Sequence, residues 1–109
     1  MADRIIKEDE SMFKLGVIDE IMLIHAIKRG DEEATNKLVE DNMEFLTKVA
    51  KRFLGSGLTL SELKEAGKRG LVEAARRYEE REGYRFTTYA IWWVRQSIMQ
   101  TVAEKLKDR

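Results

Sequence analysis

Proline is absent from all 109 residues of the chain, and this absence restricts the possible folds more than any other feature of the sequence. A proline inside a helix removes a hydrogen bond and clashes with the preceding turn, so a chain without proline can sustain long helices. Charged residues make up 37% of the sequence, and strong turn formers are few. Apolar residues recur three and four positions apart, which is the period of a helix. The sequence therefore predicts an all-α domain, a compact bundle of four to five helices.

The first half of the chain carries helix-end signals. A first helix with Ile24 and Ile27 on its inner face is expected to end near Gly30, because glycine is the usual residue just beyond a helix. Asp31 is suited to cap the helix that follows. Asn42 is expected to break or bend that helix, after which the helical spacing of apolar residues resumes.

The second half opens with an exposed loop predicted at Gly55–Gly57. Thr59 and Glu62 form a capping-box pattern, which predicts the start of a long helix. Gly67 and Gly70 lie inside that helix, where each costs roughly 1 kcal/mol relative to alanine. We therefore expect another helix to approach this one closely at the two glycines.

The last helix is expected to be capped by Thr87 or Thr88 and to run to about Lys105, with two different faces. Ala90 and Val94 belong to a face with the spacing of buried positions. The other faces combine flat aromatic rings with amide side chains: Tyr89, Trp92, Trp93, Gln96 and Gln100.

This combination suits an unpaired nucleic-acid strand. Aromatic side chains stack on bases at roughly 1–3 kcal/mol per base, glutamine can pair with adenine, and arginine neutralises phosphate. The alternative is that the tryptophans are core or half-core residues and that the arginines form a solvated face. The 20 basic and 20 acidic residues give no net charge, which favours that alternative. The arginines concerned are Arg76, Arg77, Arg81, Arg85 and Arg95.

Several function classes lack the residues they need. There is no cysteine, and the lone histidine, His25, makes a histidine metal site improbable. Neither a phosphate-binding loop nor a catalytic triad spacing is present. We therefore expect no enzyme activity, no metal or other cofactor and no small-molecule substrate. No apolar run reaches the roughly 18 residues of a membrane span, and the first residues lack an apolar signal region, so we expect a cytoplasmic protein.

The segments "GLTLSELKEAGKRGLVEAARRYEEREG" and "GYRFTTYAIWWVRQSI" closely resemble the second domain of primary-type bacterial RNA polymerase sigma factors. The resemblance runs without gaps from about Asn42 to Ala103. It implies a helical domain over residues 18–109, preceded by a weakly matched N-terminal segment, 1–17. It also implies binding to single-stranded or fork-junction promoter DNA and melting of the minus-ten element in concert with RNA polymerase. A sigma factor would continue past this point to a linker and a helix-turn-helix domain.

The resemblance assigns DNA contacts position by position. Tyr89 would stack where a flipped adenine leaves the duplex. Trp92 and Trp93 would form a wedge at the upstream fork, and Gln96 would face the last paired position. The other implied contacts are Tyr84, Phe86 and Thr88 along the non-template strand, Arg77 and Arg95 at its backbone, and Asn42 and Phe45 at a downstream flipped base.

The surface that would dock the clamp helices of the polymerase departs from the family pattern. The family usually has Gln-Glu-Gly-Asn where residues 65–68 read Glu-Ala-Gly-Lys. Glu73 and Glu82 stand where basic residues are common, and Met99 stands where a polar, base-facing residue is common. The alternative function is therefore a sigma-like protein-interaction module, a decoy or regulator that does not engage promoter DNA. The implied polymerase-binding residues are Glu62, Leu63, Glu65, Ala66 and Lys68.

Overall fold

A computed structural model describes residues 16–107 of the chain, so all but the last two residues of the predicted N-terminal segment lie outside the described part. These residues form α-helices and one short 3₁₀ turn, and the described part contains no strand. The prediction of an all-α fold is confirmed. The elements are α2 (Val17–Lys28), α3 (Glu32–Asp41), α4 (Met43–Lys51), α5 (Leu60–Arg77), the 3₁₀ turn η1 (Glu80–Glu82) and α6 (Phe86–Lys107).

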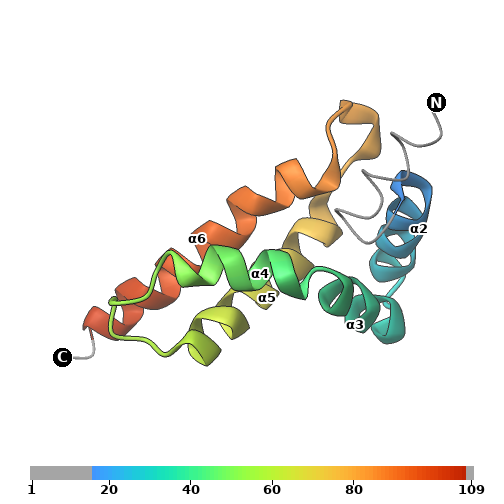
Figure 1. Ribbon diagram of the computed structural model, residues 1–109. Helices are drawn as coiled ribbons and strands as arrows, with labels where there is room; N and C mark the ends of the chain where they lie inside the picture. Colours follow the sequence, from blue (N-terminus) through green and yellow to red (C-terminus); the bar gives the residue numbers. More distant parts are fainter. Residues whose placement is uncertain (1–15, 108–109) are drawn as a thin grey trace, which may run out of the picture.

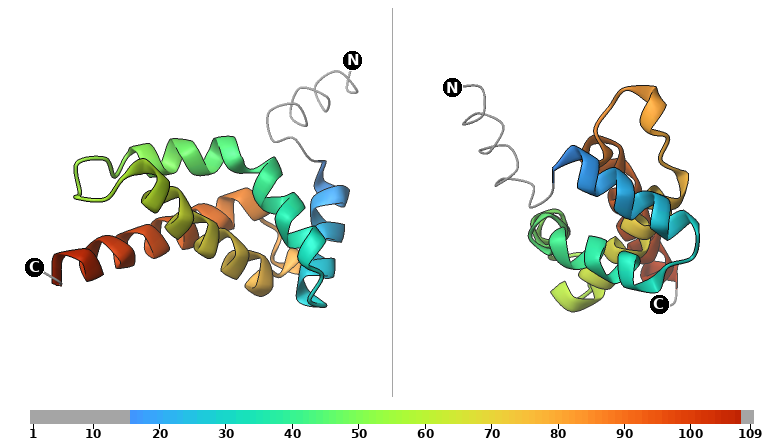
Figure 2. Two further views of the ribbon diagram at one scale, coloured as in Figure 1. Left: turned by 90° about the horizontal axis from the view of Figure 1, so that it is seen from below. Right: turned by 90° about the vertical axis from the view of Figure 1, so that its right-hand side faces the viewer.

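The two longest helices, α5 and α6, pack along each other and form the most extensive pairing in the domain. Helix α4 lies against both of them, while α2 and α3 pair with each other and with α5. Figures 1 and 2 show α2 and α3 together at the end where α6 begins. The loop between α4 and α5 lies at the opposite end, beside the last turns of α6.

The core lies where these helices meet and includes residues from each of α2 to α6. Helix α6 contributes every fourth residue, Phe86, Ala90, Val94 and Ile98, and none of these side chains is exposed. The buried face predicted for the last helix is therefore confirmed. The other large, fully buried side chains are Ile24, Leu38, Leu46, Leu63 and Leu71.

Two of the predicted helix starts are confirmed by hydrogen bonds. The Asp31 side chain accepts a hydrogen bond from the backbone N–H of Ala34 at the start of α3. Thr59 and Glu62 form a reciprocal capping box at the start of α5. Both pairs satisfy backbone N–H groups that the first turn of a helix leaves without partners.

The predicted break at Asn42 is also confirmed, and its side chain stabilises it. Asn42 separates α3 from α4, and its amide donates to the carbonyl of Leu38 at 2.8 Å. The predicted cap of the last helix is wrong. Helix α6 begins at Phe86, so Thr87 and Thr88 belong to its first turn.

Gly70 explains how closely α5 and α6 pack. A Cβ atom at this position would lie 2.5 Å from the carbonyl oxygen of Trp93 and 2.8 Å from the Cα of Val94. Carbon atoms essentially never come this close to backbone, so only glycine fits without a shift. The predicted close approach of a second helix is confirmed. The contact lies at the backbone of Trp93 and Val94, so it fixes where the tryptophans of α6 lie along α5.

Candidate nucleic-acid interface

Six aromatic side chains form one connected cluster around the turn between α5 and α6 and the first two turns of α6. The rings of Tyr84 and Tyr89 are stacked, with centres 5.6 Å apart and planes 25° apart. Trp93 meets Tyr89 edge-on at 6.2 Å, and Trp92 meets Trp93 at 5.2 Å with an angle of 86°. We call this cluster the aromatic array: Tyr78, Tyr84, Phe86, Tyr89, Trp92 and Trp93.

The array has a buried base and an exposed edge. Phe86 is fully buried and Tyr78 is 6% exposed, whereas Tyr84 is 39% and Trp92 57% exposed. Tyr89 and Trp93 are half-buried between these layers. The sequence left two interpretations open, that the tryptophans are exposed base-stacking residues or that they are core residues. Each fits one tryptophan, because Trp93 packs on the core while Trp92 lies largely in solvent.

Tyr78 packs beneath the array and contacts three of its rings, a role that was not predicted from the sequence. Its ring contacts those of Tyr84, Phe86 and Tyr89, at centre distances between 5.5 and 6.0 Å. Its hydroxyl donates a hydrogen bond to the backbone carbonyl of Tyr84. Burial raises the pKa of this phenol above its ordinary value, so the hydroxyl keeps the proton that it donates. An aromatic residue at the end of a helical pattern, followed by a polar turn, was the available signal.

The burial of Phe86 corrects one predicted contact. Phe86 was expected to line the path of the non-template strand, but its ring lies under the array with no exposed surface. It can therefore support the array without touching a strand. Thr88, by contrast, is exposed on the first turn of α6.

A shallow groove on α6 continues the exposed edge of the array. It brings together Trp92, Gln96 and Arg95, which the resemblance had assigned to one DNA contact surface. The groove also contains Ile91 and Met99, which are 36% and 50% exposed. Ile91 was missed, although positions 91, 95 and 99 repeat every four residues and so share a helix face.

Arg77 connects the array to α5. Its guanidinium carbon lies 5.2 Å from the centre of the Trp93 ring, within the range of a cation–π contact. Its Nε donates to Oε1 of Glu73 at 2.6 Å. The indole Nε1 of Trp93 is buried and has no hydrogen-bond partner within the part of the chain that the structure describes.

Helix α2 fastens the turn that carries Tyr84. His25 bonds to Glu80 of the 3₁₀ turn, and the ammonium of Lys28 donates to the carbonyl of Tyr78 at 2.5 Å. These links were not predicted, because residues 50 or 55 positions apart leave no local pattern.

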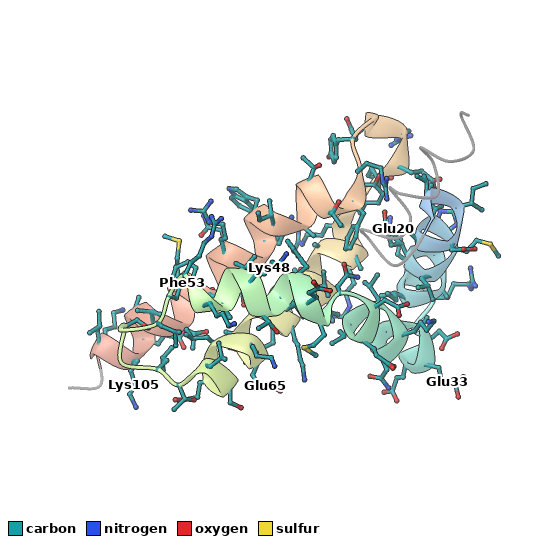
Figure 3. The ribbon with its side chains drawn as sticks, viewed as in Figure 1. Glu20, Glu33, Lys48, Phe53, Glu65 and Lys105 are labelled. Carbon is teal, nitrogen blue, oxygen red and sulfur yellow. The ribbon has the colours of Figure 1, made fainter. Side chains whose placement is uncertain are left out.

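A third link joins a buried carboxylate to an arginine beside the array. Glu20, 2% exposed, lies 3.6 Å from Arg85, and Figure 3 shows it on the inner side of α2. Burial raises the pKa of the Glu20 carboxyl, and Arg85 opposes that rise. Arg85 is thus tied to the protein rather than presented to a phosphate as the sequence alone suggested.

The implied downstream pocket residues lie on the α3–α4 segment, whereas α5, α6 and the turn between them carry the array. Asn42 is 5% exposed and its amide is already bonded to Leu38. Phe45 is half-buried on α4. Asn42 is therefore almost covered by the protein and offers a base little surface.

The implied polymerase-binding residues divide between surface and core. Glu62 and Glu65 are exposed on α5, and Lys68 pairs with Glu65 at 2.9 Å. Leu63 and Ala66 have no exposed surface, so a direct contact with a partner conflicts with their burial. The carbonyl of Ala66 accepts a hydrogen bond from Ser97 on α6, which places it inside the α5–α6 contact.

Helix α5 and the α3–α4 segment border a groove of about 680 Å³ next to these residues. Its apolar lining is Val39, Met43 and Val72, and both charge signs occur on its rim. The pKa of Glu65 is held below its ordinary value by the hydrogen bond from Lys68, so this rim carboxylate stays charged at neutral pH. The groove can accept an apolar ridge flanked by charged groups.

Residues 16–107 contain neither a metal centre nor a membrane-spanning helix. No group of three or more histidine and carboxylate side chains there is arranged to hold a metal ion. Nor does any helix in that range combine the length and the apolar character needed to cross a membrane.

Comparison with known proteins places this geometry in a family. The sequence profile of sigma-70 region 2 matches residues 38–105, which include the whole of α4 and α5, the array and most of α6. RNA polymerase sigma factor SigA of a Bacillus species is 37% identical over 93 residues, 85% of this chain and 25% of the relative. RNA polymerase sigma factor SigA of Clostridium acetobutylicum is 37% identical over 89 residues, 82% of this chain and 24% of the relative. The chain thus spans about a quarter of the length of the curated relatives it matches. The family profile, these two relatives and the helical fold around the paired tryptophans agree: the chain belongs to the sigma-70 region 2 family.

Proposed function

We propose that this domain binds the unpaired non-template strand of a minus-ten promoter element and stabilises its separation from the template strand, in concert with RNA polymerase. The observation that carries the proposal is the exposed edge of the aromatic array beside Gln96 and Arg95. Flat rings that end in solvent can stack on bases that have lost their own stacking partners. Both relatives are named as RNA polymerase sigma factors, which supports the partner.

Stacking has to supply most of the affinity in this proposal. The chain has no net charge, so a general attraction to phosphate is weak. Trp92 provides the largest exposed aromatic surface, and Tyr84 and Tyr89 extend it toward the turn. At roughly 1–3 kcal/mol per stacked base, two or three stacked bases would contribute about 2–9 kcal/mol to binding.

The polymerase contact is proposed for the groove between α5 and the α3–α4 segment. Glu65 and Lys68 offer charged groups there, and Val72 with Met43 offers apolar surface. Glu62 is exposed on the same helix, three residues before Glu65. An amphipathic helix of the clamp type would place its apolar ridge on the floor and its charges against the rim.

The same groove favours a second candidate, a sigma-like decoy or regulator that binds a protein without engaging promoter DNA. Its apolar floor and mixed charges suit a protein partner better than a phosphate backbone. A measurement of DNA binding separates the two candidates. A decoy would use the groove to bind a protein and would not need the exposed indole of Trp92.

The test is a titration of a fluorescently labelled single strand carrying a minus-ten-like sequence, with the matching duplex as competitor. Trp92→Ala should weaken binding of the single strand about 5- to 150-fold, equivalent to the loss of roughly 1–3 kcal/mol of stacking. Leu106→Ala is the matched control, because Leu106 is similarly exposed, at 56%, near the far end of α6. Equal affinity of both variants, or preference for the duplex, would refute the proposal.

A further inference from the structure

Arg77 is held at the edge of the aromatic array by two contacts. Its guanidinium lies 5.2 Å from the centre of the Trp93 ring, and its Nε donates to the Glu73 carboxylate at 2.6 Å. The two charged residues are four positions apart on α5, with the carboxylate nearer the N-terminus, which is the favourable order for such a pair. Arg77 therefore already has an anionic partner in the free protein.

A nucleic-acid strand would compete for this arginine. A base stacked near the tryptophans brings its phosphate to the rim of the array, where Arg77 is the cation in contact with Trp93. Carboxylates and phosphates accept hydrogen bonds from the same guanidinium N–H groups, and each favours a charge-assisted pair. The Arg77 and Glu73 side chains are 59% and 37% exposed, so a phosphate can reach the guanidinium.

We propose that Glu73 sets the affinity of the array for single-stranded DNA by competing with the backbone phosphate for Arg77. The inference rests on the proposed function. In the free protein Glu73 occupies an N–H of Arg77 and adds a negative charge at the rim, and binding of a strand displaces it. Glu73 is therefore an affinity-determining residue that does not itself touch a base.

The experiment compares the full chain with Glu73→Gln, which keeps the shape of the side chain and removes its charge. Exposed helix pairs of this kind are weak, so the variant should bind a labelled single strand about two- to fivefold more tightly at low ionic strength. The strand has to break the Glu73–Arg77 pair only in the parent, and salt screens that exposed pair. The gain should therefore shrink as salt rises, so the slope of log affinity against log salt should be steeper for Glu73→Gln than for the parent. A purely structural role of Glu73 would leave that slope unchanged.

Glu33→Gln is the matched charge control. Glu33 is exposed in the first turn of α3, away from the array elements (Figure 3), and its replacement changes the net charge by the same amount. An equal gain in affinity for Glu33→Gln and Glu73→Gln would overturn the inference, since net charge alone would then explain the effect.

A double-mutant cycle with Arg77→Gln tests the mechanism. If Glu73 acts by holding Arg77, Glu73→Gln should have no effect once Arg77 is removed. A gain of the same size in the Arg77→Gln background would overturn the inference, because Glu73 would then repel the strand directly. Measurable binding with no gain in Glu73→Gln would overturn this inference alone, whereas no binding by any form would overturn the proposed function as well.

Discussion

Replacing Gly70 with alanine should force α5 and α6 apart and destabilise the domain. The added Cβ would lie 2.5 Å from the carbonyl oxygen of Trp93, whereas ordinary contacts begin at 3.4 Å. The difference, 3.4 − 2.5 = 0.9 Å, has to be absorbed by backbone, since the obstructing atoms belong to the main chain of Trp93 and Val94. A gap of roughly 1 Å already removes a quarter to a half of the dispersion attraction between the surfaces that separate.

The expected magnitude is the balance of two effects. Overpacking of a tight core contact typically costs about 1–3 kcal/mol, and a clash with backbone belongs at the upper end. Alanine recovers about 1 kcal/mol of helix propensity relative to glycine. The net loss in the free energy of unfolding is therefore about 2 kcal/mol, which lowers the Tm of a domain of this size by roughly 8–16 °C.

Urea and thermal unfolding followed by circular dichroism at 222 nm measure this loss. Gly67→Ala is the matched control on the same helix, because its Cβ would meet the side-chain tip of Leu46 at 3.3 Å rather than backbone. We expect Gly67→Ala to remain within about 1 kcal/mol of the parent protein. A Gly70→Ala protein as stable as Gly67→Ala would refute the packing argument.

Three further predictions concern the tryptophans, the buried carboxylate and the choice of base. Trp92→Ala should leave the Tm nearly unchanged, whereas Trp93→Ala should lower the free energy of unfolding by about 2 kcal/mol or more in urea titrations, because only Trp93 packs on the core. The raised pKa of Glu20 means that the folded state binds its proton more tightly than the unfolded state does, so this site favours unfolding as pH rises above the ordinary value of 4.5. Urea titrations between about pH 4.5 and 7 should therefore show a smaller fall in stability with rising pH for Glu20→Gln than for the parent, and identical slopes would contradict the assignment. In competition titrations, replacing the adenine expected to stack on Tyr89 should weaken binding of the single strand by roughly 1–3 kcal/mol, whereas equal affinity would leave only nonspecific stacking.

The elements that could be predicted from sequence are those set by short-range patterns. Asp31, the Thr59–Glu62 box and the break at Asn42 involve partners at most four residues apart, and each was correctly placed. The four-residue period of Ala90 and Val94 likewise identified the buried face of α6. Such signals depend on helix geometry alone, so they survive without knowledge of the tertiary fold.

The features that the sequence did not reveal depend on contacts between distant residues, which a linear pattern does not encode. Phe86 and Ala66 lie in motifs of the family, but whether such a residue touches a ligand or supports one that does depends on which helix covers it. The links from Glu20 and Lys28 to the turn beside the array likewise join distant parts of the chain. Glu20 lies four residues before Ile24 and so shares its helix face, which was the available sign of the first link.

The central claim is that an unpaired DNA strand binds on the aromatic array, and the indole N–H signals of the two tryptophans test it most directly. The chain has two tryptophans, so ¹H–¹⁵N correlation spectra contain two side-chain indole signals that a variant of either residue assigns. On titration with a minus-ten-like single strand, both signals should move along the same saturation curve, with backbone signals of Tyr84 and Tyr89. Saturation of the protein with the strand while both indole signals stay in place would contradict the account.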